Sequence, residues 1–284
     1  MDQIIIAFSG RKAAGKNTIA KYVASYYAVN KAAREFPDPL DTCEIPERSY
    51  EIEEKETLEC SFADNLKAFC IDTLGLAHEQ CYGTDDEKNS PTEYDWKNAP
   101  RFLAWKFGDK YAKELVAEGM MQDGLISNFV EQKLKHECDF DTELRYRTGK
   151  MTGRDIMQIV GTDLCRQTFG NIWAAATVRM IKKQGKALNL ITDNRFPNEI
   201  EIILDQPYGY VVRLTRSPFG TVDAHPSESA LDDYDWNRDK CFVLDNAKMS
   251  IEEQNEAIKP LIDKICNFSG SINYPTTKDG WVCS

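Results

Sequence analysis

The segment that most constrains the fold is Ser9–Thr18, which directly follows the apolar run Ile4–Phe8. It contains a glycine, four further residues, a glycine-lysine pair and a polar residue, which is the pattern of a phosphate-binding loop. The glycines allow torsions and close approaches that a Cβ would obstruct, so N–H groups can surround phosphate oxygens while Lys16 reaches the phosphate being transferred. Residues 19–24 continue as an amphipathic helix, whose N-terminus favours an anion. The strand before the loop and the helix after it favour this interpretation over a simple glycine-rich turn.

Composition and charge limit the classes of protein to be considered. The 284 residues, 42% of them hydrophobic, are enough for a sizeable core in one large domain or two. There is no run of 18 apolar residues and no signal-peptide core, so we expect a cytoplasmic protein, in the host cytoplasm if it is viral, that does not enter a membrane. The nine cysteines include no Cys-x-x-Cys pair, so reduced thiols are expected rather than disulfides or a zinc site.

The net charge of −11 argues against broad binding to nucleic acid or to an anionic membrane. No stripe of alternating aromatic and basic residues, which is typical of single-strand binding, occurs in the sequence. To bind an anionic small molecule, the protein would therefore need a local cluster of arginines and lysines that overcomes the repulsion from its net negative charge. A homodimer is compatible with the sequence, which does not fix the oligomeric state.

Five short apolar runs are expected to form strands, at residues 4–8, 57–62, 187–191, 210–215 and 241–244. Helical patterns are expected over residues 151–162, from Trp173 to about Lys183, from Pro197, and from Ile251 to about Phe268. Because strands and helices alternate, we expect a doubly wound α/β fold with a mainly parallel five-stranded sheet and helical insertions. It would form one domain over residues 1–268, followed by a tail at 269–284.

Two insertions are expected, at about residues 31–56 and 75–150. The first contains three prolines and little apolar periodicity, so we expect a surface loop. The polar stretch at 82–91 in the second is also expected to be a loop, with Tyr94 and Trp96 anchoring it rather than stacking on a base.

The rest of the second insertion has two further patterns. Residues 101–119 and 125–136 have helical spacing. Residues 136–150 are charged and contain Arg145, Arg147 and Lys150, which indicates either a solvated face or a lid in a phosphate-handling protein.

Polar residues follow the expected strands, and these are Gly10, Asp193, Arg216 and Asn246, with Asp64 and Lys67 shortly after the second strand. Ligands of a doubly wound sheet gather at the carboxyl ends of its strands. A phosphate loop near Asp193 and Arg195 suits phosphoryl transfer, in which the protein aligns two anions and neutralises charge. Asp193 would orient Mg²⁺ through water or accept a hydrogen bond from a substrate hydroxyl, or else act as a helix cap or a partner of Arg195. Arg154 and Arg166, on expected helices, suit surface ion pairs and phosphate clamping equally.

Several motifs occur together in one order: Gly15-Lys16-Asn17-Thr18, Phe62-Ala63-Asp64-Asn65-Leu66-Lys67, Tyr82-Gly83-Thr84-Asp85 with Lys88-Asn89, Gln158-Ile159-Val160-Gly161-Thr162, Trp173, and Thr192-Asp193-Asn194-Arg195-Phe196-Pro197-Asn198-Glu199. With them the chain resembles the bacteriophage deoxynucleoside monophosphate kinase family, whose fold is of the P-loop kinase type. The resemblance extends roughly from Ile4 to Glu256, and the block at Asp193–Glu199 is its most specific part.

The resemblance implies transfer of the ATP γ-phosphoryl group to a deoxynucleoside 5′-monophosphate, with Mg²⁺ as cofactor and ATP and the monophosphate as small-molecule partners. It implies ATP binding by Ala13, Gly15, Lys16, Asn17 and Thr18, and catalytic roles for Lys16, Asp193 and Arg195. It implies monophosphate binding by Lys12, Lys67, Arg101, Arg154, Gly161, Thr162, Trp173, Asp193, Arg195 and Glu199. No residue is assigned as a direct metal ligand, and the accepted base is left open.

Asn17 departs from the family pattern, because it has neither the hydroxyl group nor the charge that is usual after the loop lysine. Only its carbonyl oxygen would be offered to Mg²⁺, and Thr18 would serve the phosphates instead. Two alternatives therefore stay open. One is a P-loop kinase that acts on another small acceptor, and the other is a nucleotide-binding sensor or assembly module without turnover.

Overall fold

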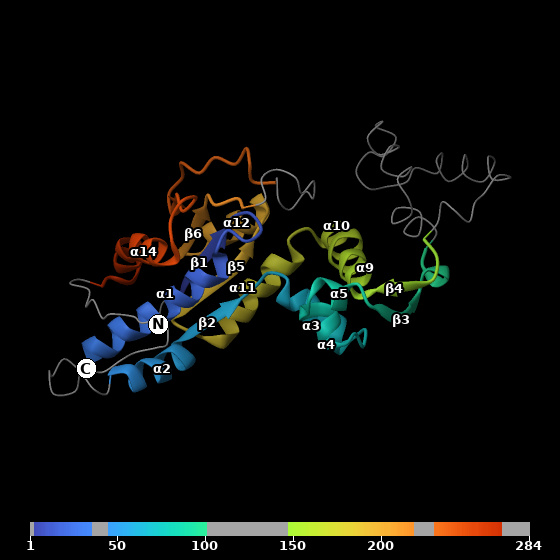
Figure 1. The fold of residues 1–284 in the computed structure, drawn as a ribbon, viewed down its shortest axis with the longest axis horizontal. Coiled ribbons are helices and arrows are strands. Elements are labelled where there is room, and N and C mark those ends of the chain that lie inside the picture. Colours follow the sequence, from blue (N-terminus) through green and yellow to red (C-terminus); the bar gives the residue numbers. More distant parts are fainter. Residues whose placement is uncertain (1–2, 36–44, 101–146, 219–229, 269–284) are drawn as a thin grey trace. The chain divides into compact units, whose positions relative to one another are not determined.

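The first apolar run of the sequence forms the central strand of a parallel sheet in the computed structural model (Figure 1). The strands are β1 (Ile4–Ser9), β2 (Thr57–Cys60), β5 (Leu188–Asn194), β6 (Gly209–Leu214) and β7 (Cys241–Leu244). Their order is β2-β5-β1-β6-β7 and every pairing is parallel, so the carboxyl ends of all five lie at the same end of the sheet. The expected doubly wound α/β fold of P-loop kinase type is confirmed.

The structure describes residues 3–35, 45–100, 147–218 and 230–268, which divide into two compact units. Unit 1 comprises the described residues of Met1–Asp64 and Trp173–Ser284, and it contains the five-stranded sheet. Unit 2 comprises those of Asn65–Ile172, and it interrupts the sequence between β2 and β5, where the second insertion is expected. The single domain over residues 1–268 stays a prediction.

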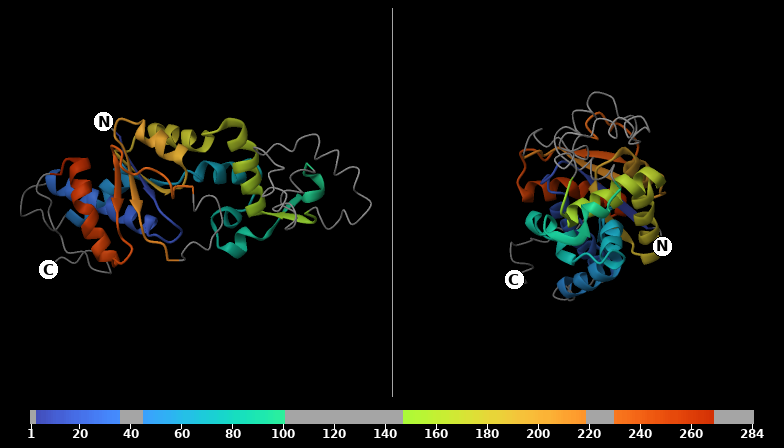
Figure 2. Two further views of the ribbon diagram at one scale, coloured as in Figure 1. Left: turned by 90° about the horizontal axis from the view of Figure 1, so that it is seen from above. Right: turned by 90° about the vertical axis from the view of Figure 1, so that its right-hand side faces the viewer.

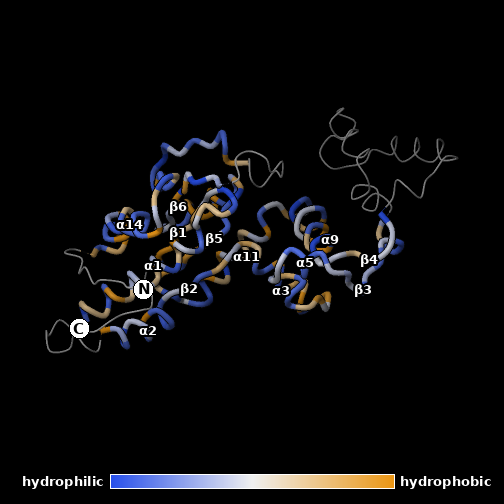
Figure 3. Tube along the Cα trace, viewed as in Figure 1, coloured by the Kyte–Doolittle hydropathy of each residue, from blue (hydrophilic) through white to orange (hydrophobic). Residues whose placement is uncertain are grey.

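Successive side chains of β1 point to opposite faces of the sheet, and each face has its own hydrophobic core. Ile6 and Phe8 pack into one cluster with α1 (Lys16–Glu35), α2 (Ile45–Glu56) and α14 (Ile251–Cys266). Ile5 and Ala7 point into a second cluster, with α11 (Ile172–Gln184) and α12 (Pro197–Leu204). The left view of Figure 2 shows α1 and α14 on one side of the sheet, and Figure 3 shows the hydropathy of the residues along the same elements.

This layering places the loop after β1 and the loop after β5 at a topological switch point. β1 leads into α1 on one face of the sheet, whereas the neighbouring β5 leads into α12 on the other face. Ligands of doubly wound folds bind where adjacent strands diverge in this way. The phosphate-loop pattern and the Asp193 block therefore follow the two strands that define this point.

The surface loop expected over residues 31–56 is wrong for the part that the structure describes. α1 continues to Glu35, and residues 45–56 form α2. Ile45, Ser49 and Ile52 are its buried residues and are spaced by four and three, which is one face of a helix. The helical periodicity is hard to recognise in the sequence, because only three residues of this charged segment are buried.

Unit 2 is built from short elements around a small apolar core. Its elements are α3 (Asp64–Asp72), which begins at the last residue of unit 1, α4 (His78–Tyr82), α5 (Asp85–Lys88), β3 (Pro91–Asp95), η2 (Trp96–Asn98), β4 (Lys150–Thr152), α9 (Gly153–Gln158), the π-helix η4 (Ile159–Arg166) and α10 (Gln167–Phe169). The loop expected over 82–91 is wrong, because Thr84 and Glu87 form a capping box that starts α5. The helix expected at 151–162 is confirmed from Gly153 onward as α9 and the start of η4, whereas Met151 and Thr152 belong to β4. Thr152 and Asp155 form a capping box at the start of α9.

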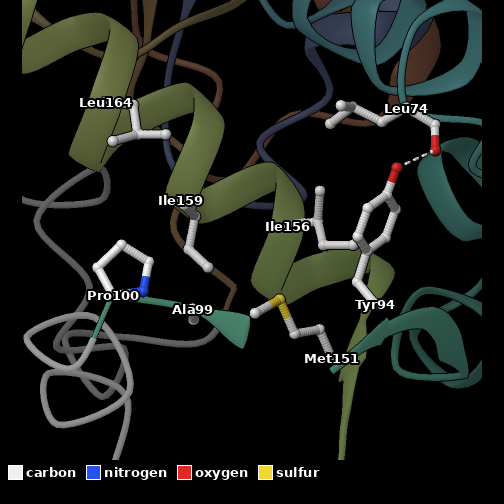
Figure 4. Close-up of a pocket in the computed structure, with 8 residues that line it drawn as sticks. All are labelled: Leu74, Tyr94, Ala99, Pro100, Met151, Ile156, Ile159 and Leu164. Atoms are coloured by element: carbon white, nitrogen blue, oxygen red, sulfur yellow. Dashed lines mark hydrogen bonds between the residues drawn. The ribbon is translucent and has the colours of Figure 1, made fainter. Parts of the chain in front are cut away.

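An apolar pocket of about 200 Å³ lies in unit 2, and Figure 4 shows its lining. The Tyr94 hydroxyl group donates to the Leu74 carbonyl at 2.7 Å, and Trp96 is buried. The anchoring of residues 82–91 by these two aromatic residues stays a prediction. Eight side chains line the pocket and none carries a charge, which makes it unsuitable for a phosphate. The predictions for residues 101–119 and 125–136, for Arg101 and Arg145, and for the tail at 269–284 concern residues outside the described part of the chain.

Substitution of a buried isoleucine in α14 should measure how strongly this helix supports the sheet. Ile258 is 1% exposed, so Ile258→Ala should lower the free energy of unfolding by about 2–5 kcal/mol through lost burial and the cavity it leaves. Ile251→Ala, in the same helix at a side chain that is 51% exposed, should change it by no more than about 0.5 kcal/mol. Urea unfolding checks both, and equal losses would contradict the assigned packing of α14.

Candidate functional site

The phosphate-loop pattern forms a turn that returns to the start of α1. Lys16 is the first residue of that helix and is buried, and its ammonium group donates to the carbonyl oxygens of Gly10 and Arg11 at 2.8 Å each. The lysine therefore lies across the loop. Because the helix N-terminus and this ammonium group are both positive, the loop is a favourable place for an anion.

The loop backbone takes torsions that most residues avoid. Gly15 has a φ of +97°, and a Cβ there would lie 3.1 Å from the Gln254 Oε1 atom. Ala13 has a φ of +58°, which places a residue with a Cβ in the left-handed region. The Ala13 torsion costs on the order of 1 kcal/mol, and such a torsion persists where the surrounding structure holds it. The glycine of the motif is thus required for both its torsion and its close approach to α14.

Side chains around the loop differ in exposure. Lys12, Asn17 and Thr18 are exposed, whereas Lys16 and Ala14 are buried. The resemblance assigns nucleotide contacts to these three exposed residues and also to the buried Lys16. Asn17 and Thr18 also offer oxygen atoms, which are the atoms that Mg²⁺ prefers.

Arg11, inside the loop, forms an ion pair that the sequence does not predict. Its guanidinium group donates to both carboxylate oxygens of Asp232, at 2.8 and 2.7 Å. Arg213 of β6 lies nearby in the sheet register, opposite Ser9, and donates to the Ser9 hydroxyl oxygen at 3.1 Å. The segment before β7 thus contacts the loop through an exposed, bidentate pair.

Asp193 is the second-last residue of β5 and does not lie beyond the strand, because β5 continues to Asn194. One carboxylate oxygen accepts from the Phe62 N–H at 2.7 Å and the other from the Ala63 N–H at 3.2 Å. Burial raises the pKa of this carboxyl group, against the lowering effect of the two backbone N–H groups and of Arg195. The contact ties β5 to the turn that leads into α3, so a structural role stands beside the catalytic role that the sequence suggests.

Glu199 has a clear local contact. It is buried, and its Oε2 atom accepts from the N–H groups of Arg195 and Phe196 at 2.8 and 3.1 Å. It therefore caps α12, whose first residue is Pro197. Trp173, to which the resemblance assigns monophosphate binding, is buried near the start of α11.

Four assigned residues lie in unit 2, and these are Lys67, Arg154, Gly161 and Thr162. The Lys67 ammonium group lies 4.2 Å from the centre of the Tyr82 ring, and Arg154 donates to Asp85 at 2.6 Å. A Cβ on Gly161 would lie 2.6 Å from the Leu66 Cδ2 atom, so η4 packs closely against the residue before Lys67. The structure thus brings the motifs around residues 66 and 161 together, while Thr162 is exposed.

The described residues contain no cluster of three or more His, Cys, Asp or Glu side chains that could hold a metal ion. Cys60, beside Asp193 and Asp64, does not change this, because burial raises the pKa of its thiol to about 12 and keeps it protonated. Within the same part of the chain, no helix is long and apolar enough to cross a membrane.

Comparison with known proteins adds one relative. The chain is 27% identical over 195 residues to a protein of Acanthamoeba polyphaga mimivirus named "Putative deoxynucleotide monophosphate kinase". The match covers 64% of this chain and 73% of that protein. No protein-family model matches the chain. The relative is not a bacteriophage protein, so the phage label of the resemblance stays a prediction.

A methyl group at Gly15 tests the geometry of the loop. Gly15→Ala should lower the free energy of unfolding by about 1–3 kcal/mol, because it combines an unfavourable φ with a contact against Gln254. Gly185→Ala is the matched control, since Gly185 has a φ of +70° and no atom within 4 Å of its Cβ position. Gly185→Ala should lower the free energy of unfolding by only about 1 kcal/mol. Equal losses in thermal unfolding would show that the approach to Gln254 is unimportant.

Proposed function

We propose that the protein transfers the γ-phosphoryl group of ATP to a deoxynucleoside 5′-monophosphate, which yields ADP and a deoxynucleoside diphosphate. The observation that supports the proposal is a loop with the phosphate-binding pattern after β1, at the switch point beside the end of β5, where Asp193 and Arg195 lie. The kinase name of the mimivirus relative supports a nucleotide kinase at a coarse level. The choice of a deoxynucleotide rests on the order of the motifs between Gly15 and Glu199.

The loop residues would bind the donor. The N–H groups at the N-terminus of α1 would face the phosphates, and Lys16 would exchange its two carbonyl partners for phosphate oxygens. Charge spreads over the equatorial oxygens of the transferring group in the transition state, so a fixed ammonium group stabilises that state more than the ground state. Lys16 is suited to this task because it is buried and already held in place.

Mg²⁺ fits the oxygen donors of the loop. It binds through few protein ligands and keeps several waters and phosphate oxygens, so the site does not need a cluster of carboxylates. Asn17 and Thr18 are the residues that would hold it or its waters. When bound, it would neutralise charge between the β- and γ-phosphates.

The acceptor contacts rest on the resemblance. Arg195 would bind a phosphate oxygen, and Asp193 would fix the backbone at Phe62 and Ala63 as well as orient the acceptor. The remaining assigned residues are Lys12, Trp173 and Glu199 in unit 1 and Lys67, Arg154, Gly161 and Thr162 in unit 2, with Arg101 outside the described residues. Because Glu199 caps α12, we propose that it acts on the acceptor through the backbone of Arg195.

Asn17 supports one further candidate, a nucleotide-binding protein without turnover, because it cannot supply the usual hydroxyl group to Mg²⁺. Tight binding of ATP and a monophosphate without phosphoryl transfer would favour it. A kinase for a non-nucleotide acceptor would be recognised by a preference for that acceptor in the same assay.

Removal of the loop lysine should abolish turnover. Lys16→Ala should lower the rate of ADP release that depends on a deoxynucleoside monophosphate by at least about 100-fold, because the transition-state charge loses its nearest cation. Lys21→Ala, at an exposed lysine of the same helix, should stay within about twofold of wild type. A coupled assay with the four common monophosphates measures both. Normal ATP binding by the folded wild type without turnover of any of them would contradict the proposal.

Lys12 is proposed to face the acceptor. Lys12→Ala should raise KM for the monophosphate about fivefold or more, and it should raise KM for ATP less, because an exposed charged hydrogen bond to the acceptor is lost. Lys12→Arg keeps the charge and should recover much of the loss. A larger effect on ATP than on the monophosphate would place Lys12 on the donor side instead.

A further inference from the structure

Two buried amide side chains lie directly behind the phosphate loop. Asn246 follows β7 and is 0% exposed, and Gln254 in the first turns of α14 is 1% exposed. The Asn246 amide nitrogen donates to the Ala14 carbonyl oxygen at 2.9 Å and to the Gln254 Oε1 atom at 2.5 Å. A buried amide must satisfy its donors inside the protein, so these bonds fix the position of Asn246 against the loop.

The side-chain oxygen of Asn246 also has a hydrogen-bond partner. Its Oδ1 atom accepts from the Arg216 N–H at 2.9 Å, and the Arg216 Nε–H donates back to the Asn246 carbonyl oxygen at 3.2 Å. Arg216 follows the end of β6. One side chain therefore joins three segments at the carboxyl end of the sheet, namely the phosphate loop, the end of β6 and the start of α14. Because the amide nitrogen and the amide oxygen of Asn246 are both paired, the network restricts the conformations open to the loop backbone.

The bond to Ala14 sets the direction of a loop N–H group. In a planar trans peptide unit, the C=O and the N–H that follows point in opposite directions, and the described chain has no cis peptide bond. Because the Ala14 carbonyl points at Asn246, the Gly15 N–H points away from it. Gln254 Oε1, which accepts from the same Asn246 nitrogen, also lies close to Gly15, 3.1 Å from the position of a Cβ there.

We propose that Asn246 and Gln254 are positioning residues for the donor nucleotide, which hold the Ala14–Gly15 peptide so that its N–H faces the phosphate site. The inference rests on the proposed binding of ATP at this loop. A loop whose N–H groups are already oriented binds its anion without the entropy cost of ordering them, so loss of the pair weakens donor binding. Acceptor binding, which does not use this peptide, stays unchanged.

The fold offers a matched control for this pair. Asn189 of β5 is also 0% exposed, and its amide nitrogen donates to two backbone carbonyl oxygens, those of Ile4 at 3.1 Å and Lys186 at 3.0 Å. Both contacts lie at the amino end of the sheet, away from the loop. Asn246→Asp and Asn189→Asp make the same chemical change, since each replaces a two-bond donor by an acceptor that faces carbonyl-type oxygens. A general loss of stability should therefore affect both variants alike.

The test measures the equilibrium Kd of ATP and of a deoxynucleoside monophosphate separately by titration calorimetry, together with thermal unfolding. Asn246→Asp should raise the Kd of ATP about tenfold or more and leave that of the monophosphate within about twofold, while Asn189→Asp leaves both within about twofold. If either Asp variant fails to fold, Asn246→Ala and Asn189→Ala give the same comparison, because Ala removes the donor without adding a charge. Gln254→Met, which keeps the length of the side chain but removes the acceptor, should raise the Kd of ATP less than the Asn246 variants do.

The outcomes separate this inference from the proposed function. Wild-type protein that binds no ATP would contradict both. Wild-type protein that binds ATP with the same Kd as folded Asn246 variants would overturn the positioning role alone. Equal weakening by the Asn189 variants would also overturn it, because a general effect on stability would then explain the result.

Discussion

The site depends on the hydrogen-bonded position of β1 in the middle of a parallel sheet. Because β1 pairs with β5 on one side and β6 on the other, the loop that follows it emerges at the centre of the carboxyl end. Neighbouring strands place three further residues at this end of the sheet: Asp193 lies near the end of β5, Arg213 lies in β6, and Asn246 follows β7. The two apolar faces of β1 hold this arrangement, since one packs against α1 and α14 and the other against α11 and α12.

Around this strand, the protein combines one strained, positively charged loop with backbone contacts that keep its neighbours rigid. Asp193 holds the turn before α3, Glu199 caps α12, and Asn246 holds the loop itself. All three side chains form hydrogen bonds with backbone groups, so each fixes the local backbone around the candidate site. This division of tasks suits phosphoryl transfer, in which alignment and fixed charge contribute most of the catalysis.

Much of the sheet could be predicted from the sequence, because each strand is a local apolar run and the loop is a local pattern. α2 and α5 were missed since their signals are weak: three buried residues among charges in one, and a single capping box in the other. The contacts of the candidate site could not be predicted from local sequence patterns. Asn246 is recognisable as a polar residue after a strand, but its bond to Ala14 joins residues 232 positions apart. Gln254 lies on the buried face of α14 with Ile258, Ile262 and Ile265, and no local pattern predicts its contact with Asn246.

The most direct test of the central claim follows the phosphorus atom itself. ATP labelled at its γ-phosphate is incubated with the full-length protein, Mg²⁺ and each deoxynucleoside monophosphate in turn, and the products are separated. We predict that the label moves into a deoxynucleoside diphosphate in an amount equal to the ADP formed. Label that stays in ATP, or that appears only as inorganic phosphate with every acceptor, would contradict the account.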